Sequence, residues 1–318
     1  MTREQPSLRR RWKAFRKRLL GFAPFIRRSR HERAIARINK HVDYLRQTNE
    51  GMGLLFFVPP PLANTAPCDI RVPFSNAPIE ELCLFVTYAA NAELKSHVVD
   101  HVNALLDASV HVVLIVNTDL DRASMQIPPE LARRLYGCLV RQNLGFDFAA
   151  WAHAYSLIDP RAVRSRLYLV NDSIIGPLDL AHYATMLQRV RASPADVVGL
   201  TANPDPHEHL QSFFLVFNEG LLHSPTFDAL MHNVVNMPHK QNVIDCYEIW
   251  LSPFLQKSGF TASAIFPKLS TLPPPQRNDT LISWRALLDI GFPFVKSMVL
   301  RDPIEGEAAR HVVPQKYQ

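Results

Sequence analysis

The sequence contains little cysteine, and its four cysteines include no Cys-x-x-Cys pair. This spacing argues against a structural zinc site, and the low number favours a protein of the reducing cytosol. No run reaches the roughly 18 apolar residues of a membrane-spanning helix. The apolar segment at 19–26 is shorter, has basic residues on both sides and lacks a clear cleavage site, so it does not fit a signal peptide.

Two common nucleotide-binding signatures are also missing. The sequence has no Gly-x-Gly-x-x-Gly motif after a predicted strand and no P-loop. These absences argue against dinucleotide binding and against ordinary nucleoside triphosphate hydrolysis. The 318 residues are 47% hydrophobic and 20% charged, which is enough apolar material for one large α/β domain or two small ones.

Positive charge is concentrated at the N-terminus. Residues 1–40 carry 14 Lys and Arg against Glu4 and Glu32, a balance of +12 that leaves −6 for the rest of the chain. A helix here would place Trp12, Phe15 and Leu19 on one face and basic residues on the others, as in helices that lie on anionic membranes. We therefore predict that 1–50 is a basic helical arm.

This arm leads to a prediction of location. Contact with an anionic membrane through residues 1–40 would make the protein cytoplasmic and peripheral on the inner face of the membrane. A helix docked on its own domain, or a tail, is the alternative for this segment. Nucleic acid is the least favoured partner, because no nucleic-acid-binding motif accompanies the arm.

After a connector at 51–80, apolar runs alternate with helical patterns. Buried strands are predicted at 82–86, 110–116, 139–141, 167–170, 197–200 and 212–217, and helices at 94–109, 129–138 and 148–156. Continuous apolar runs are typical of strands buried on both faces. The alternation predicts an α/β domain over 81–305, with a mostly parallel central sheet flanked by helices, and a C-terminal tail at 306–318.

Polar residues follow these strands, at the edge where open parallel sheets bind ligands. After the third strand, Arg141 and Asn143 are candidates to hold a phosphate or a sugar hydroxyl. Asp147 is either a ligand contact or the N-cap of the helix that follows. After the fourth strand, Asp172 either holds a divalent cation or caps a turn together with Asn171.

Later segments supply further candidates. His209 and Gln211 lie at the start of a strand and are predicted to line an acceptor or sugar pocket. Glu248 is predicted to open a helix, where it is either a general base or a carboxylate favoured by the helix dipole. Lys296 and Arg301 are candidate phosphate contacts.

These motifs, in their order along residues 80–305, resemble the rhamnan synthesis protein F family. The matching segments are Arg141-x-Asn143-x-Gly145-x-Asp147-Phe148-x-x-Trp151, Asn171-Asp172-Ser173, Gly176-Pro177-Leu178, Gly199-Leu200-Thr201, His209-Leu210-Gln211-Ser212-Phe213-Phe214 and Pro293-Phe294-x-Lys296. The resemblance implies a glycosyltransferase with a GT-A type sheet. It leaves the arm at 1–50 unexplained.

The resemblance also implies roles for particular residues. In GT-A enzymes an Asp-x-Asp motif after a central strand holds a metal and the donor diphosphate, and Asn171-Asp172-Ser173 stands in that place with a single carboxylate. An Mg²⁺ or Mn²⁺ cofactor would therefore depend on Asp172. Glu248, eleven residues before Gly259, resembles the acidic base of inverting members. The implied donor site is Arg141, Asn143, Asp147, Asn171, Asp172, Ser173 and Lys296, and the implied sugar or acceptor pocket is His209, Gln211 and Trp151.

The function implied is transfer of a sugar, rhamnose by resemblance, from a nucleotide-diphosphate sugar. The acceptor would be a cell-surface polysaccharide, a lipopolysaccharide or a lipid-linked glycan, and the transfer would invert the anomeric centre. The alternative is a non-catalytic scaffold or glycan-binding member of a polysaccharide-assembly complex, which the missing second carboxylate favours.

Overall fold

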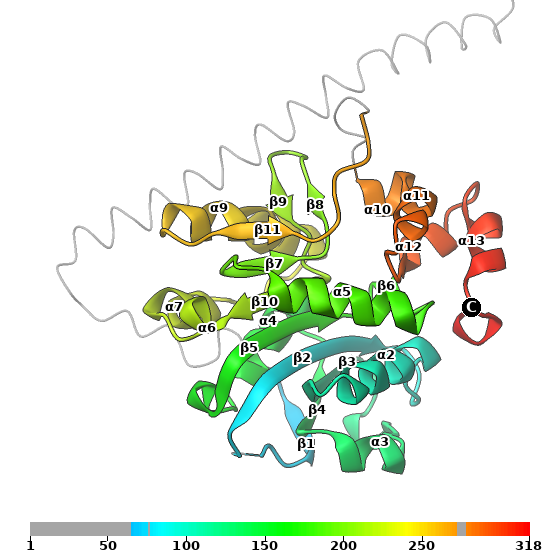
Figure 1. Cartoon of the computed structure of the whole chain (residues 1–318). Helices are drawn as coiled ribbons and strands as arrows, with labels where there is room; N and C mark the ends of the chain where they lie inside the picture. The colour runs from blue at the N-terminus through cyan, green and yellow to red at the C-terminus, as the bar shows by residue number, and fades with distance from the viewer. Residues whose placement is uncertain (1–64, 76, 272–277) are drawn as a thin grey trace, which may run out of the picture. The chain divides into compact units, whose positions relative to one another are not determined.

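A sheet of eight strands forms the centre of the computed structural model (Figure 1). The structure describes residues 65–75, 77–271 and 278–318, so the predicted arm at 1–50 and its membrane contact lie outside the described residues. The strands, in spatial order, are β1 (Cys68–Val72), β4 (Gly137–Gln142), β3 (His111–Thr118), β2 (Ile79–Ala89), β5 (Val163–Asn171), β10 (Phe214–Asn218), β7 (Val197–Gly199) and β11 (Ala262–Ala264).

Most neighbouring strands in this sheet run parallel. β4, β3, β2 and β5 form a parallel block, and β11 pairs in parallel with β7. The edge strand β1 and the inner strand β10 run antiparallel to their neighbours. The prediction of an α/β fold with a mostly parallel sheet is therefore confirmed, although the sequence pattern gave no sign that β10 is reversed.

Successive side chains of each strand point to opposite faces of the sheet, and helices bury both faces. In β2, Cys83 and Phe85 join one apolar cluster, whereas Leu82 and Leu84 join another on the opposite face. The first cluster is covered by α2 (Ser96–Asp107), α3 (Pro129–Arg134) and α5 (Leu180–Ala192). The second is covered by α4 (Phe146–Tyr155), α6 (Glu219–Leu222), α7 (Pro225–His232) and α9 (Ile249–Lys257).

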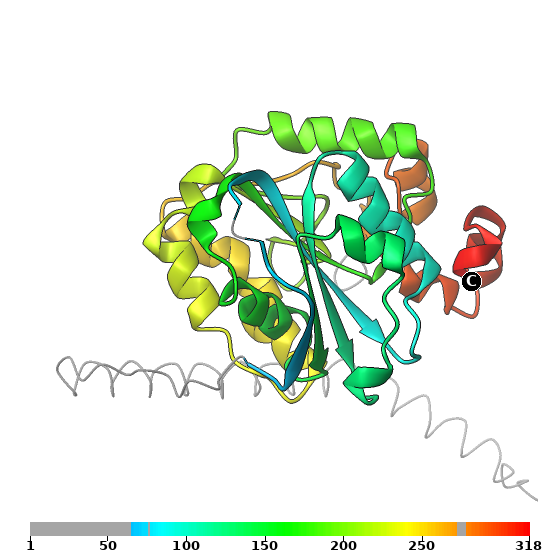
Figure 2. The same ribbon diagram turned by 90° about the horizontal axis from the view of Figure 1, so that it is seen from below.

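Figure 2 shows the sheet between these two helical layers, with α2 and α5 on one side and α4 and α7 on the other. Among the described helices, none combines the length and apolar character that crossing a bilayer requires.

The C-terminal part forms a third, smaller apolar cluster. It contains α10 (Asp279–Ile282), α11 (Trp284–Asp289), β12 (Val295–Lys296), α12 (Ser297–Leu300), α13 (Gly306–Val312) and a 3-10 turn, η4 (Gln315–Tyr317). β12 pairs antiparallel with the short strand β6 (Ile174–Ile175). This pairing brings Lys296 next to the turn that follows β5.

Two predicted boundaries differ from the folded unit. Strand β1 lies inside the predicted connector at 51–80, yet it pairs with β4 and forms an edge of the main sheet. In the predicted tail at 306–318, the Nζ of Lys316 and the hydroxyl of Tyr317 donate to Asp100 Oδ2 of α2, at 2.5 and 2.6 Å. The unit therefore begins before residue 81 and continues past residue 305.

Candidate functional site

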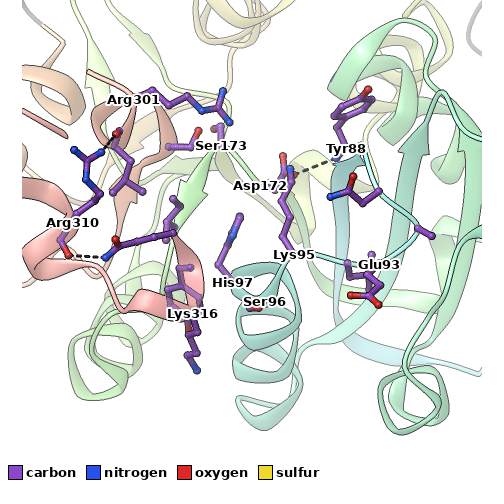
Figure 3. A pocket seen from close by; sticks show the side chains of 18 of the residues that line it. Tyr88, Glu93, Lys95, Ser96, His97, Asp172, Ser173, Arg301, Arg310 and Lys316 are labelled. Atoms are coloured by element: carbon purple, nitrogen blue, oxygen red, sulfur yellow. Dashed lines mark hydrogen bonds and ion pairs between the residues drawn. The ribbon is translucent and has the colours of Figure 1, made fainter. Parts of the chain in front are cut away.

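A cavity of about 870 Å³ opens at the edge of the sheet where the parallel strands end (Figure 3). Tyr88 borders it near the end of β2, and Asp172 and Ser173 border it after β5. In Figure 3 the first residues of α2 lie on one side of the cavity, and Arg301, Arg310 and Lys316 of the C-terminal segment lie on the other. The cavity is thus built from segments that are far apart in the sequence.

Asp172 is held in place by three donors. Its Oδ2 accepts hydrogen bonds from the Thr87 hydroxyl at 2.6 Å and from the Tyr88 amide at 3.2 Å. The same oxygen forms an ion pair with Lys95 Nζ at 2.6 Å, and 40% of the Lys95 side chain is exposed against 15% for Asp172. Asp172 therefore faces the cavity as half of an ion pair.

This set of donors does not fit a metal ion held by the protein. Mg²⁺ and Mn²⁺ prefer several oxygen ligands, and carboxylates compensate their charge. Within the described ranges, no three His, Cys, Asp or Glu side chains gather closely enough to hold a metal. The neighbouring amide oxygen, Asn171 Oδ1, already accepts from both the backbone N–H and the hydroxyl of Ser173. The carboxylate that remains, Asp172, is paired with an ammonium group.

A chain of hydrogen bonds runs behind Asp172. Asn171 Nδ2 donates to Asp147 Oδ2 at 2.9 Å, and Lys296 Nζ donates to Ser173 Oγ at 3.1 Å. The Lys296 ammonium also lies 4.2 Å from the centre of the Phe213 ring. Four of the predicted donor-site residues therefore lie together, and one of them, Ser173, borders the cavity.

Asp147 was also predicted as a possible N-cap, and that alternative is wrong. Helix α4 begins at Phe146, and its N-cap is Gly145, in the left-handed region at φ 71°. Asp147 lies in the first turn and points to Asn171 instead. The helix begins two residues earlier than predicted, because glycine adopts the backbone conformation of Gly145 at little cost.

Burial shifts the pKa values of two groups in this chain. Burial raises the pKa of Asp147 to about 6, and the Asp172 carboxylate adds to the shift. Burial lowers the pKa of Lys296 to about 8, against the opposing effect of the Glu248 carboxylate. The Glu248 carboxylate also raises the pKa of Asp147, and the Lys240 ammonium lowers the pKa of both Asp147 and Lys296. Asp172 and Glu248 therefore converge on the same small region.

Glu248 enters this region from a long helical run. Segment α8 (Lys240–Val243) continues through a π-helical turn, η3 (Ile244–Glu248), directly into α9. Glu248 therefore lies inside a helix and not at its start, so the helix-dipole alternative is wrong. A π-helical turn widens the helix locally and is frequent at functional sites.

The carboxylate of Glu248 is oriented by two neighbours. Its Oε2 accepts a hydrogen bond from the Ser212 hydroxyl, and its Oε1 lies 3.9 Å from His209 Nε2. His209 is 2% exposed, and the other nitrogen of its ring, Nδ1, bonds the carbonyl oxygen of His207. About a fifth of the Glu248 side chain is exposed. The Glu248 carboxylate is therefore held in one orientation while part of the side chain remains accessible to a ligand.

Gln211, which was predicted to line the sugar pocket together with His209, has both of its side-chain polar atoms in hydrogen bonds. Gln211 Oε1 accepts from the Thr201 hydroxyl at 2.7 Å, and its Nε2 donates to Asn278 Oδ1 at 3.3 Å. Gln211 is buried. It therefore joins the end of β7 to the start of α10.

Two predicted site residues belong to the core. Arg141 is fully buried, donates from Nη1 to Asn117 Oδ1 at 3.0 Å, and has its pKa lowered to about 10 by burial. Trp151 is also fully buried, with its ring centre 5.2 Å from that of Phe148. The predictions of a donor contact at Arg141 and a sugar contact at Trp151 are wrong for this structure, because neither side chain reaches solvent.

Asn143 lies apart from the residues around Asp172. Its Nδ2 donates to Asp119 Oδ2 at 3.4 Å, and Asp119 also accepts from the Tyr88 hydroxyl at 2.9 Å. Tyr88 borders the cavity, so the hydrogen-bonded group of Asn143, Asp119 and Tyr88 is connected to the cavity through Tyr88. A role for Asn143 in donor binding stays a prediction.

Sequence reasoning missed four basic residues that line the cavity, Lys95, Lys240, Arg310 and Lys316. Lys95 comes directly before α2, and Lys240 is the first residue of α8. A lysine before the helix that follows the first buried strand could have been noted, since this helix begins at the ligand-binding edge. No comparable signal marks Lys240. Arg301, which the sequence did suggest, also lines the cavity.

A family profile described as Rhamnan synthesis protein F matches residues 112–315. A Sinorhizobium fredii protein described as "Uncharacterized protein y4gN" is 30% identical over 132 residues, which cover 40% of this chain. The chain spans 34% of the length of that relative.

Among solved structures, the mannosyltransferase PcManGT from Pyrobaculum calidifontis, in complex with GDP-Man and Mn²⁺, has a TM-score of 0.37 and 12% sequence identity. The match covers 76% of this chain and 71% of that one.

Proposed function

Because this chain belongs to the rhamnan synthesis protein F family, as the sequence predicted, we propose that it is a glycosyltransferase that uses a nucleotide-diphosphate sugar. Two observations support this: the Glu248 carboxylate acts on Lys296, which bonds the cavity residue Ser173, and the cavity lining carries five Lys and Arg against two Asp and Glu. An excess of basic side chains suits a diphosphate, since charge-assisted hydrogen bonds to phosphate are strong.

The chemistry proposed is a single displacement at C1 of the sugar. Glu248 takes the proton of the acceptor hydroxyl as that oxygen bonds to C1. The bond between C1 and the diphosphate oxygen breaks at the same time, and the nucleoside diphosphate leaves with the electron pair. The transition state resembles an oxocarbenium ion, as in glycoside hydrolysis. Attack from the face opposite the leaving group inverts the anomeric centre.

Neighbouring side chains support this role for Glu248. The Ser212 hydroxyl bonds one oxygen of the carboxylate and the His209 ring lies 3.9 Å from the other, so the carboxylate is confined and need not reorient during the reaction. Lys296 lies close enough for the Glu248 charge to raise its pKa against the effect of burial, and the two groups therefore share one electrostatic environment. We assign Lys296 to the leaving phosphate and Glu248 to the acceptor.

The test of this role is Glu248→Gln. Loss of a general base typically lowers a rate by about 10²–10⁴-fold, so transfer should fall by that factor. Binding of the nucleoside diphosphate, measured by calorimetry, should change little, because the base does not contact the phosphates. Glu219→Gln, an exposed change on α6, is the matched control. Transfer by Glu248→Gln at a rate close to that of the unchanged protein would contradict the assignment.

The finer parts of the proposal come from the family resemblance. They are rhamnose as the sugar and a surface polysaccharide, lipopolysaccharide or lipid-linked glycan as the acceptor. Work at the cytoplasmic face of a membrane is proposed on other grounds, from the basic charge of residues 1–40. A panel of nucleotide sugars in a thermal-shift assay would identify the donor, because a ligand that binds only the native state raises the melting temperature.

A second candidate function is a non-catalytic scaffold in a polysaccharide-assembly complex. The observation that favours it is the single carboxylate of the Asn171-Asp172-Ser173 turn, already paired with Lys95. A scaffold would bind a partner or a glycan but no nucleoside diphosphate. Calorimetry with dTDP, UDP and GDP separates the two functions, since a transferase should bind at least one of them.

A further inference from the structure

We propose that side-chain cations, and not a divalent metal ion, neutralise the diphosphate of the donor at this site. Besides Lys296, the cations are Lys95, Lys240 and Arg301, which approach the cavity from three separate elements. This inference rests on the proposed function and specifies how the same site works. It follows from how Asp172 is already paired and from which cations remain without a partner.

The first step concerns Asp172. Its Oδ2 accepts from the Thr87 hydroxyl, the Tyr88 amide and the Lys95 ammonium group. A metal ion bound there would have to displace Lys95, or would lie next to its positive charge. Either event reduces the attraction that one carboxylate offers to a dication. Lys95 therefore occupies the position in which a metal ion would be useful.

The second step concerns the cations that have no partner. Lys240 and Arg301 are both exposed and both line the cavity. Neither makes a side-chain hydrogen bond or an ion pair with any residue that the structure describes. Lys316, on the same wall, is paired with Asp100. Two free cations beside the neutral pair of Lys95 and Asp172 leave the cavity with positive charge available for an anion.

The third step concerns the start of α2, where Lys95 is the N-cap residue. No described side chain caps this helix, and its first turn contains no acidic residue. The N-terminal end of a helix attracts anions through its free N–H groups and its dipole. His97, in the first turn, is 7% exposed and lines the cavity, and its Nε2 has no partner among the described groups. Lys95 and this helix end thus present positive charge to the same space.

The experiment measures binding of dTDP, UDP and GDP to the whole chain by calorimetry, first in EDTA and then with Mn²⁺. At least one nucleotide should bind in EDTA, and Mn²⁺ should change its Kd by less than about twofold. Lys95→Met should weaken that binding in EDTA by about tenfold or more, the scale of one charge-assisted contact. Because this change also frees Asp172, Mn²⁺ should restore part of the loss.

Controls keep the result interpretable. Lys257→Met, an exposed change at the end of α9 and outside the cavity, should bind as the unchanged chain does. Circular dichroism would confirm that Lys95→Met folds, and Lys240→Met provides a second variant with the same expected loss. Both positions are exposed, so neither change opens the core.

The failures of the two proposals look different. Binding that is absent in EDTA and appears with Mn²⁺ would overturn this inference and leave the proposed function standing. Unchanged binding by both Lys95→Met and Lys240→Met would also overturn it. Absence of binding to all three nucleotides, with and without Mn²⁺, would overturn the proposed function and this inference together.

Discussion

Replacing Lys296 with methionine should stabilise the protein in the absence of ligand. The Lys296 ammonium lies between Ser173 Oγ, at 3.1 Å, and the Phe213 ring, at 4.2 Å, and burial lowers its pKa to about 8. A lowered pKa means that the folded protein disfavours the charged form. Methionine has a similar length and no charge, so it removes this cost.

The size of the effect follows from the shift of the pKa. A fall from 10.5 to about 8 corresponds to about 3 kcal/mol, at roughly 1.4 kcal/mol per unit. Below pH 8 the lysine is charged in both the folded and the unfolded state, so the full cost is present. Between pH 8 and 10.5 the folded state releases its proton first, and the cost falls as pH rises. At pH 9.5 about half of it remains.

Urea unfolding at pH 7 and pH 9.5 measures both parts of this prediction. The lost hydrogen bond and cation–π contact offset the gain by about 1–2 kcal/mol at pH 7. The deciding quantity is therefore the difference between Lys296→Met and the unchanged chain, which should fall by about 1.5–2 kcal/mol as pH rises. Lys257→Met is the matched control. A difference that stays constant from pH 7 to 9.5 would refute the reasoning.

Two further changes test the neighbourhood of Asp147. Because burial and Asp172 raise its pKa from 3.8 to about 6, Asp147→Asn should stabilise the protein by up to about 3 kcal/mol at pH 7. The gain should vanish near pH 4, and urea unfolding that shows an equal gain at both pH values would contradict it. Gly145→Ala should destabilise by about 2 kcal/mol or more, since φ is +71° and the added Cβ would lie 2.5 Å from Ala149 Cβ. An unchanged melting temperature would count against this strain.

The sheet could be predicted from the sequence because its central strands are buried on both faces. Runs such as 82–86 and 112–116 are apolar without interruption, and they lie in β2 and β3. The reversal of β10 could not be predicted in the same way, because a strand buried on both faces has the same pattern whichever way it runs. The role of Cys68–Val72 was missed because short edge strands carry little periodic signal.

The site was predicted in part, for a related reason. Asp172 and Ser173 follow a buried strand, and the rule for ligand binding at strand ends places both of them at the cavity. The same rule failed for Arg141, because it does not say which face of the sheet a side chain occupies. Arg141 alternates with Val140 in β4 and shares the face of Leu139, beneath the helix layer that contains α4. The ion pair of Lys95 with Asp172 joins residues 77 positions apart, which no local pattern reveals.

The charges around Asp147 and Lys296 are arranged in a way that stability alone would not favour. These two groups have opposite charges, yet each bonds a neutral partner, Asn171 or Ser173, and burial shifts both pKa values toward the neutral form. Natural sequences depart from locally stable choices mainly at functional sites. A diphosphate beside Lys296 would favour its charged form and so offset the cost that the empty site carries. Binding of an anion and protonation of Lys296 should therefore strengthen each other, which links the instability of this cluster to the donor that we propose it binds.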